Sequence, residues 1–577
     1  MAAGTVDPTR AFLAETERHL LALANESSQA SWVYETYITP DSQAVSARAY
    51  ARVIDATVRA AKRSVRLPAP STASDARQLH LLRNCLPLIA PEDPAKAESL
   101  TQTVAAMTGT YGKGRYALAG TTTPLDLQAL SRLLAENREP AQLYDAWDGW
   151  HRIGRLVRSD FTRYVALANE GARELDFADT GAMWRSKYDM APSAFSAEVE
   201  RLWEQVAPLY RLLHAYVRAK LVARYGPSVV PPTGPIPAHL LGNMWAQSWE
   251  HVYDLVAPAG RALPYDLTAT LRGQGVDSRG MVRYAERFFT SLGMRPLPAS
   301  FWERSMFDKP ADRDVVCHAS AWDVDNDADL RIKMCVEITA EDFRVIHHEL
   351  GHNYYQWAYA GLPYLFRDGA HDGFHEAIGD TIALSVTPEY LKQVGLLDAI
   401  PGPEEDLGLL LMAALEKVAF LPFGLLIDQW RWKVFAGEIG PEAYNASWWE
   451  LRRRYQGIAP APARDETEFD PGAKFHVTAN TPYMRYFLAH ILQFQFHRAL
   501  AQTIGWSGPL HRASIYGSRA AGDRFREMLA MGASKPWPDA LEAATGERAM
   551  DGTALLEYFA PLHRWLEEQT RGLPVGW

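Results

Sequence analysis

The segment His348-Glu349-Leu350-Gly351-His352 restricts the local fold of this 577-residue chain more tightly than any other segment. On an α-helix, residues i and i+4 share a face, so the two histidines can both reach one metal ion. Thr339 and Asp342 resemble a capping box, so the helix is predicted to begin there. Glu349 would lie beside the imidazoles, where it can polarise a zinc-bound water. The alternative is a surface helix that carries three polar residues.

A catalytic zinc ion needs a third protein ligand and an open position for water. Residues 372–380 begin a second predicted helix, and Glu376 lies 24 residues after His352. Glu376 would be the third ligand if the two helices are antiparallel neighbours, and His375 is a competing ligand. Asp380, one turn after Glu376, is predicted to accept a hydrogen bond from a ligand imidazole and fix its tautomer. The alternative for Asp380 is an ordinary charge on the helix surface.

One stretch has the two-residue periodicity of a β-strand. Apolar side chains alternate with other residues over 330–338, and a short apolar run at 315–322 precedes them. The turn-rich segment between these runs predicts a β-hairpin. A turn centred near Asn326 would place Cys317 opposite Cys335. The two cysteines would be bridged in an oxidising compartment or remain two reduced thiols.

The first hundred residues read as long helices. Asp7 and Pro8 form a helix start signal, with the aspartate as N-cap and the proline at the first helical position. The proline-rich run at 231–237 cannot be helical and is a candidate loop between two large parts of the chain. The length leaves room for several domains or for one large enzyme body.

The composition excludes several classes of protein. Hydrophobic residues make up 47% and charged residues 22% of the chain, which is typical of a folded globular protein. The net charge of −10 argues against binding to nucleic acid or to an anionic membrane surface. No stretch approaches the roughly 18–20 consecutive apolar residues of a membrane span. The three cysteines are too few for a disulfide scaffold.

Several segments resemble a known family. At residues 234–247, 316–323, 347–352, 373–380, 428–432, 469–476, 485–487 and 493–496, the chain resembles the angiotensin-converting enzyme family of zinc peptidyl-dipeptidases. The similarity runs from about residue 10 to the C-terminus, so residues 1–577 would form one catalytic domain. The resemblance implies a mainly α fold, a large helical ellipsoid in which two subdomains flank a deep central cleft. Residues 1–100 would form an N-terminal helical lid, with the small β-hairpin near the zinc site.

The resemblance also implies roles for the residues of the zinc motif. One zinc ion would be held by His348, His352 and Glu376. Glu349 would act as general base toward water and then as general acid toward the leaving amine. Tyr486 would donate a hydrogen bond to the developing oxyanion.

Further residues would bind the peptide. His476 and His318 would hydrogen-bond substrate carbonyls, and Ala319 and Ala321 would pair with the substrate backbone as an added strand. The other residues implied to bind substrate are Gln274, Lys474 and Tyr483 at the C-terminal carboxylate, and Phe420 and Phe423 in a side-chain pocket that His490 makes more polar.

Gln274 bears on the choice of product. The carboxypeptidase homologue of the family has an arginine at the position assigned to Gln274, and that longer arm shortens the pocket so that one residue is removed. Gln274 therefore favours release of dipeptides. The alternative is that Gln274 is only a loop residue.

The family also binds chloride, so chloride is an expected second ion. Arg185, Trp448 and Arg452 match one chloride site, whereas Tyr216 and Arg485 match the other. These arginines could equally form internal salt bridges. Together with the hairpin geometry, the resemblance favours a disulfide between Cys317 and Cys335.

The sequence thus predicts a zinc-dependent peptidyl-dipeptidase that hydrolyses C-terminal dipeptides from oligopeptides with a free C-terminus. Zinc-chelating dipeptide mimics would inhibit it. The alternatives are a single-residue metallocarboxypeptidase and a catalytically idle homologue that binds peptides or a partner. The first residues lack the basic and apolar regions of a secretory signal, so the protein is either cytoplasmic or numbered after a removed signal. We expect a periplasmic or secreted protein, and the excess of Arg over Lys hints at a bacterial source.

Overall fold

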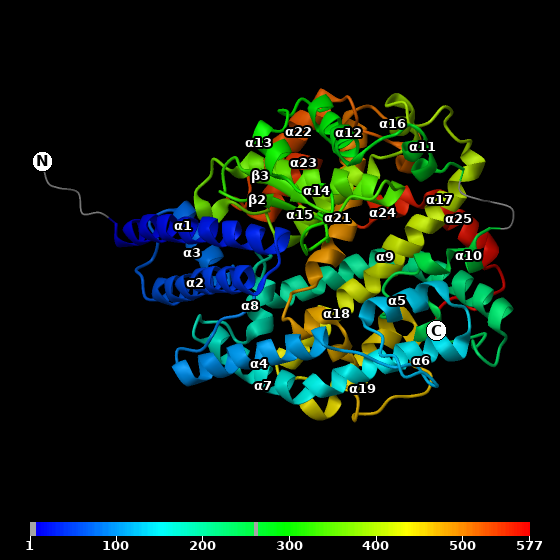
Figure 1. Ribbon diagram of the computed structural model, residues 1–577, viewed down its shortest axis with the longest axis horizontal. Helices are drawn as coiled ribbons and strands as arrows, with labels where there is room; N and C mark the ends of the chain where they lie inside the picture. Colours follow the sequence, from blue (N-terminus) through cyan, green and yellow to red (C-terminus); the bar gives the residue numbers. More distant parts are fainter. Residues whose placement is uncertain (1–6, 259–263) are drawn as a thin grey trace, which may run out of the picture.

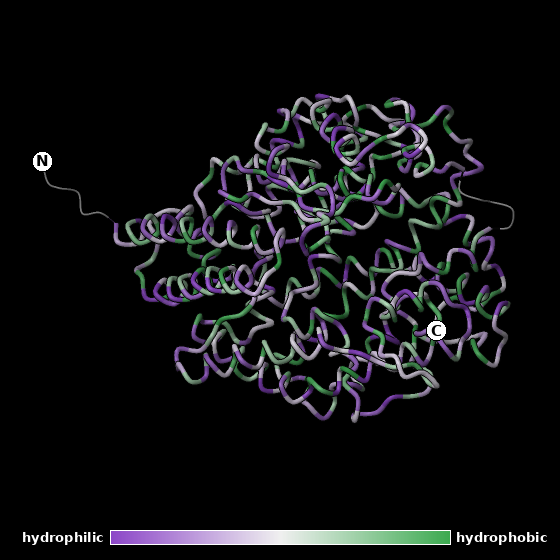
Figure 2. The backbone as a smooth tube through the Cα atoms, viewed as in Figure 1, coloured by the Kyte–Doolittle hydropathy of each residue, from purple (hydrophilic) through white to green (hydrophobic). Residues whose placement is uncertain are grey.

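The computed structural model describes residues 7–258 and 264–577, and helices dominate it (Figure 1). The chain begins with three helices, α1 (Pro8–Thr36), α2 (Pro40–Val65) and α3 (Ala73–Asn84). The Asp7 side chain accepts a hydrogen bond from the backbone N–H of Thr9, which confirms the predicted helix start. Figure 2 shows hydrophilic and hydrophobic positions mixed along α1 and α2, as expected for helices with one buried face.

The remaining helices form the body of the molecule. The first group is α4 (Pro94–Gly112), α5 (Leu127–Glu136), α6 (Pro140–His151), α7 (Arg158–Arg173), α8 (Thr180–Ser186), α9 (Pro192–Tyr225) and α10 (Tyr253–Val256). The second is α11 (Leu267–Gly273), α12 (Ser278–Ser291), α13 (Ala299–Arg304), α14 (Ala340–Tyr359), α15 (Asp372–Leu384), α16 (Pro388–Gln393) and α17 (Asp406–Ala413). The third is α18 (Ala419–Phe435), α19 (Tyr444–Leu451), α20 (Phe475–Thr478), α21 (Met484–Thr503), α22 (Arg519–Leu529), α23 (Trp537–Thr545), α24 (Thr553–Tyr558) and α25 (Ala560–Gln569).

Segments far apart in sequence build each half of the view in Figure 1. Helices α4, α6, α7 and α19 lie along the lower edge, and α12, α13, α16 and α22 lie along the upper edge. Helix α15 packs against both α14 and α21 between them. The mainly α fold is confirmed, whereas the cleft and its two flanking subdomains stay predictions.

The predicted β-hairpin is present but shorter than its sequence pattern. Strand β2 (Ser320–Asp323) pairs antiparallel with β3 (Leu330–Lys333). The other edge of β3 carries a parallel bridge between Lys333 and Met306, in which the backbone N–H of Met334 donates to the carbonyl of Met306 at 2.9 Å. A second small sheet joins β1 (Ile236–Pro237), at the end of the proline-rich run, to β4 (Ile458–Ala459) in parallel.

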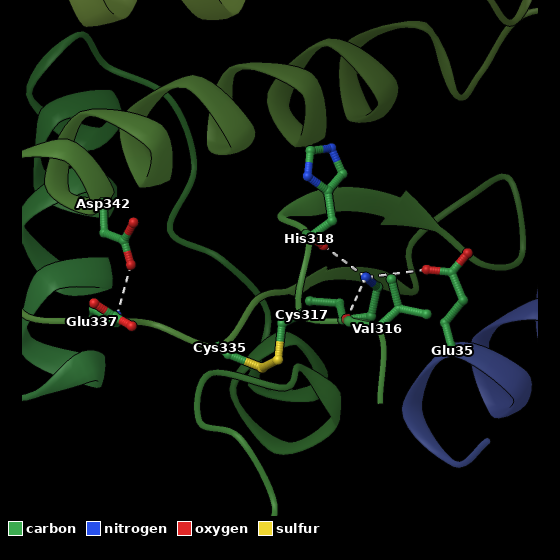
Figure 3. Close-up of a disulfide and its surroundings, with 8 residues drawn as sticks. Glu35, Val316, Cys317, His318, Cys335, Glu337 and Asp342 are labelled. Atoms are coloured by element: carbon green, nitrogen blue, oxygen red, sulfur yellow. Dashed lines mark hydrogen bonds and ion pairs between the residues drawn. A yellow bond between two sulfur atoms is a disulfide. The ribbon is translucent and has the colours of Figure 1, made fainter. Parts of the chain in front are cut away.

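A disulfide joins Cys317 and Cys335 directly below the hairpin, with a Cα–Cα distance of 4.9 Å (Figure 3). The strand register is centred between Asn326 and Asp327, half a residue from the predicted centre. The cysteines therefore meet beyond the end of the ladder, where the Cys335 N–H donates to the Cys317 carbonyl at 3.4 Å. The remaining thiol, Cys85, is exposed.

One continuous helical segment, Pro403–Phe435, is long and apolar enough to pass a length-and-composition test for a membrane span. It includes α17 and α18. In the described part of the chain 78% of its apolar window is buried by other protein segments, as in a core helix. The segment is therefore weak evidence for a membrane span.

Candidate zinc site and substrate pocket

Helices α14 and α15 meet at two glycines. Helix α14 begins after Thr339, whose hydroxyl accepts from the backbone N–H of Asp342 at 3.1 Å, as the capping box predicts. A Cβ atom on Gly351 would lie 2.9 Å from the Cα of Gly379, and one on Gly379 would lie 2.7 Å from Nδ1 of His348. The absence of side chains at both positions therefore lets the helices approach closely.

Three side chains on these helices converge into a possible metal-binding cluster. The Nε2 atoms of His348 and His352 are 3.0 Å apart, and His348 Nε2 lies 3.6 Å from a carboxylate oxygen of Glu376. All three donor atoms lie within 4.8 Å of one another. Tetrahedral zinc with bonds of about 2.0–2.1 Å separates its ligand atoms by about 3.3 Å, so two imidazoles and a carboxylate in this arrangement fit zinc.

Further side chains orient the two imidazoles. Nδ1 of His348 lies 3.2 Å from Asp380, which also accepts from Gln493 at 3.0 Å. Nδ1 of His352 lies 3.3 Å from Nδ1 of His375. His375 thus lies behind a ligand histidine rather than in the cluster. Because His348 meets Asp380 while His352 meets His375, the contacts run in opposite order along α14 and α15, as antiparallel helices require.

Electrostatics favour an ionised Asp380 at this position. Burial alone would favour the neutral acid, but Lys417, 3.9 Å away, and His348 hold the pKa of Asp380 well below its usual range. A carboxylate beside Nδ1 fixes the tautomer in which Nε2 is free to bind a metal. The contact favours the predicted role of Asp380 over an ordinary surface charge.

Glu349 links the metal cluster to the hairpin. It is 8% exposed, and its carboxylate accepts a hydrogen bond from the backbone N–H of Ala321 in β2. Burial, together with the nearby charge of Glu376, raises the pKa of Glu349. A raised pKa brings a carboxylate closer to the neutral range in which a general base also works as an acid.

Tyr486, Tyr483 and His476 form one ring cluster near the metal cluster. The ring of Tyr483 lies 4.9 Å from that of Tyr486 and 4.7 Å from that of His476. Burial and the charge of Glu376 raise the pKa of Tyr486, so its phenol stays protonated. Burial, then Lys474 and Arg431, lowers the pKa of His476 to about 3. Tyr486 and a neutral His476 can therefore both donate hydrogen bonds.

A buried cation lies next to this ring cluster. Lys474 donates to the side-chain oxygen of Gln247 at 2.6 Å, and its ammonium lies 3.9 Å from the centre of the Trp245 ring. The Tyr483 hydroxyl also donates to Gln247, at 3.4 Å. Lys474 and Tyr483, two donors suited to a carboxylate, thus converge on the side-chain oxygen of Gln247.

The structure does not bring Gln274 to this place. Gln274 is exposed at the C-terminal end of α11, and its amide donates to the carbonyl of Gly395. The glutamine beside Lys474 is Gln247, and it ends the family-like segment at 234–247. The segment at 234–247 therefore contains the glutamine that reaches Lys474, although the sequence prediction named Gln274.

Aromatic side chains of α18 adjoin the same cation. The ring of Phe423 lies 5.9 Å from Tyr483 and 5.5 Å from the Lys474 ammonium. Phe420 stacks on His490 at 4.5 Å, which adds a polar ring to the predicted side-chain pocket.

The hairpin residues lie on a different element. His318 is exposed, and its imidazole points away from the disulfide (Figure 3). Ala319 and Ala321 are half-buried, and β2 has only β3 as a strand partner among the described residues. The second edge of β2 has no strand on it, but the Ala321 N–H there is already bonded to Glu349, so an added peptide would have to use the other backbone groups of this edge or displace that bond.

One of the two predicted chloride groups is divided in the structure. Trp448 and Arg452 are neighbours, with the guanidinium 5.6 Å from the Trp448 ring. Arg185 instead contacts Gly181, Ser196 and the Trp432 ring. Its predicted place beside Arg452 is not supported by these contacts.

The second chloride group is also divided. The Tyr216 hydroxyl donates to the carbonyl of Val256, far along the chain from Arg485. Arg485 forms an ion pair with Asp372 at 3.3 Å, the salt-bridge alternative. The tyrosine that hydrogen-bonds Asp372 is Tyr188, which no sequence motif had singled out.

Comparisons with known proteins identify the family of the chain. A family model described as angiotensin-converting enzyme matches residues 5–577. The angiotensin-converting enzyme of Bos taurus is 42% identical over 578 residues, covering 99% of this chain and 44% of that protein. That of Rattus norvegicus is 50% identical over 454 residues, covering 78% of this chain and 34% of that protein.

The angiotensin-converting enzyme of Theromyzon tessulatum is 46% identical over 454 residues, covering 78% of this chain and 73% of that protein. The present chain therefore spans less than half the length of the two mammalian relatives and a larger share of the Theromyzon protein. The match of the family model along almost the whole chain shows that the protein belongs to the angiotensin-converting enzyme family, peptidase family M2.

Proposed function

We propose that this protein is a zinc-dependent peptidyl-dipeptidase that removes C-terminal dipeptides from oligopeptides. The main support is the convergence of His348, His352 and Glu376, with Glu349 next to them on α14. Family membership supports the same activity. A tripeptide with a blocked N-terminus and a free C-terminus should yield a free dipeptide, and no cleavage of this substrate would count against the proposal.

The reaction needs a base, an oxyanion donor and fixed substrate. When bound by the three ligands, zinc supplies a Lewis acid that polarises the scissile carbonyl and lowers the pKa of water. Glu349 accepts the proton of the attacking water and returns it to the leaving amine. Tyr486 donates its phenolic hydrogen to the oxygen that gains negative charge. His476 and His318 donate to neighbouring substrate carbonyls, and Ala319 and Ala321 pair with the substrate backbone.

The convergence of Lys474, Tyr483 and Gln247 supports recognition of a free C-terminal carboxylate. The ammonium supplies charge, and the phenol supplies a second donor. Gln247, and not Gln274, lies beside Lys474, and its neutral amide lacks the longer charged arm of the carboxypeptidase homologue. Release of dipeptides is therefore favoured over release of single residues.

The charge of Lys474 makes peptide binding depend on pH. Burial and the charge of Arg452 lower the pKa of Lys474 to about 7, so the ammonium dominates only below pH 7. A substrate carboxylate binds the ammonium, so KM should be flat below pH 7 and rise about tenfold per pH unit above it. Steady-state kinetics in buffers from pH 6 to 9 measure this.

The matched controls for this prediction are a substrate amide and one variant. The amide lacks the carboxylate, so its weaker KM should not follow the titration of Lys474. Lys474→Arg keeps the charge across this pH range, so the rise should disappear for the free peptide as well. A wild-type KM that does not change between pH 6 and 9 would contradict the role of Lys474.

We also propose an anion site at Arg452. This guanidinium is 1% exposed, and burial lowers its pKa to about 9. Among the described residues, neither its Nε nor Nε1 of Trp448 has a hydrogen-bond partner. A chloride ion between these donors would compensate a buried cation. Turnover at fixed ionic strength should rise saturably with chloride and lose this response in Arg452→Gln, and a flat response in the wild type contradicts the site.

The remaining features support an exported enzyme with a small-peptide substrate. The Cys317–Cys335 disulfide favours an oxidising compartment, periplasmic or extracellular. Helices α1–α3 would form the lid over one catalytic domain, and zinc-chelating dipeptide mimics would compete with substrate. The net charge of −10 argues against nucleic acid as a partner. A catalytically idle role is disfavoured because Glu349 and Tyr486 are both present.

A further inference from the structure

The end of α1 is hydrogen-bonded to the segment that leads into the substrate-binding strand. The backbone N–H of Val316 donates to the carbonyl of Glu35 at 2.8 Å, and the N–H of Ile38 donates to the carbonyl of Asp314 at 2.9 Å. Arg313 adds a side-chain bond to the carbonyl of Thr36 at 2.9 Å. The first helix of the proposed lid and residues 313–316 are therefore held as a pair.

A buried lysine joins the two sides of this pair. Lys333, at the end of β3, is 1% exposed. Its ammonium donates to the carbonyls of Val316 at 2.8 Å and His318 at 2.7 Å, and lies 3.1 Å from the Glu35 carboxylate (Figure 3). The three N–H groups of the ammonium thus have three oxygen acceptors, and the only charged one comes from α1.

The position of α1 decides whether this buried charge is neutralised. If α1 moved away, Lys333 would keep two neutral carbonyls and lose the one carboxylate that it contacts directly, leaving only its longer-range attraction to Glu349, which is unfavourable for a buried ammonium. If the 316–318 segment moved, Lys333 would lose two acceptors while Glu35 stayed. The cation therefore favours the state in which α1 and the segment carrying His318 are both in place.

We propose that Lys333 is a positioning residue that couples closure of the lid helix α1 to the placement of the substrate-binding strand at 318–321. This inference rests on the proposed peptidase function. Lys333 does not touch the substrate: it fixes the carbonyl of His318 and, through Glu35, the last turn of α1. Substrate pairing with β2 should therefore stabilise α1 in the closed position, and an anchored α1 should tighten peptide binding.

Other contacts join α1 to the strands and the turn of the hairpin. The Trp32 ring packs against Trp322 at 5.6 Å, and Arg331 lies over the same ring at 4.8 Å. Asn326 donates to Asn25 at the hairpin turn. These contacts hold β2, β3 and their turn, whereas Lys333 holds the segment before β2 that carries His318.

The test uses the zinc-loaded full chain and hydrogen exchange. The probe is a thiol-bearing dipeptide that can ligate zinc, and exchange is followed in segments 30–39 and 313–320. In the wild type, saturating probe should slow exchange in both segments. In Glu35→Gln and Lys333→Met, the probe should still slow exchange at 313–320 but should lose most of its effect at 30–39.

Kinetics give a second readout. Lys333→Met should raise KM for a decapeptide about tenfold, because a hydrogen-bonded charge that holds the His318 segment is lost. The Lys333 charge also lowers the pKa of Glu349, so kcat is compared in Glu35→Gln, which keeps that charge and should change kcat less than about threefold. Lys62→Met is the matched control, since Lys62 anchors α2 to Ala90 and Glu174 without touching the hairpin. It should lower stability while leaving KM and the probe effect at 30–39 unchanged.

The outcomes separate this inference from the proposed function. If the wild type cleaves peptides and binds the probe but α1 is protected equally in Glu35→Gln and Lys333→Met, the coupling is wrong and the function stands. If the wild type neither cleaves peptides nor binds the probe, both are wrong. If Lys333→Met does not fold, Glu35→Gln decides alone, because the Glu35 side chain is 29% exposed and its loss leaves both carbonyl contacts of Lys333 intact.

Discussion

Replacing Glu349 by alanine is expected to lower kcat by about 10²–10⁴-fold while one zinc ion per chain stays bound. The side chain lies on the same helix as His348 and His352 but is not in the ligand cluster. Its loss removes the group that takes the proton from water, and it leaves all three donor atoms in place. Zinc content by elemental analysis, measured beside turnover of a blocked tripeptide, separates these two effects.

The matched control for Glu349→Ala is Glu341→Ala. Glu341 is an exposed glutamate in the first turn of the same helix. Its replacement should leave both zinc content and turnover close to wild type. Equal turnover of Glu349→Ala and wild type would contradict the assignment of Glu349 as general base, and loss of zinc would place it among the ligands.

Replacing His352 by alanine is expected to abolish activity by removing a metal ligand. His352 offers Nε2 to the cluster, 3.0 Å from Nε2 of His348, so its loss leaves only two protein donors. His375→Ala is the matched control, because His375 approaches Nδ1 of His352, opposite the metal-binding nitrogen, and its other ring nitrogen lies 3.1 Å from the Tyr359 hydroxyl. Loss of such an outer partner costs about 10–100-fold in metal affinity, and His352→Ala should cost more.

Zinc affinity measured in chelator-buffered solutions distinguishes the two histidines. Zinc affinity is expected to be highest in the wild type, lower in His375→Ala and lowest in His352→Ala. Excess zinc should restore the activity of His375→Ala. The reverse order would make His375 the ligand. That result would overturn the cluster of His348, His352 and Glu376.

The metal site was predictable because its information is local. The i, i+4 spacing of His348 and His352 fixes their common face once the segment is helical. Glu376 and Asp380 are one turn apart on the second helix, so their common face follows in the same way. What spacing alone did not show is how the helices come together: Gly351 and Gly379 allow the approach, and His375 turns toward His352 instead of the metal position.

The substrate and chloride assignments depended on long-range contacts, and the contacts of Gln274, Arg185 and Tyr216 do not support the places assigned to them. Gln274 and Gln247 are both plausible carboxylate ligands by residue type, but only Gln247 is brought to Lys474 by the fold. Tyr188 hydrogen-bonds Asp372 of the Asp372–Arg485 pair, whereas the Tyr216 hydroxyl donates to the carbonyl of Val256. The type of a residue does not show which loop contacts which helix. Such contacts can be assigned only from the folded structure.

The hairpin shows the same division between local pattern and tertiary contact. Alternation over 330–338 predicts a strand, and residues 330–333 of that stretch form β3. The paired strand ends at Lys333, although the Cys335 N–H still donates to the Cys317 carbonyl on the β2 side and Met306 bridges the other edge of β3. The alternating pattern therefore predicts that a strand is present, whereas the length of its pairing with β2 depends on tertiary contacts.

The most direct test of the proposed activity is a mass-spectrometric time course of a decapeptide with a free C-terminus. The zinc-loaded protein is predicted to shorten the peptide in steps of two residues and to release free dipeptides. A chelator should stop the reaction, and added zinc should restore it. A ladder of single-residue losses would contradict the account in favour of a carboxypeptidase, and an unchanged decapeptide would contradict it in favour of a binding protein.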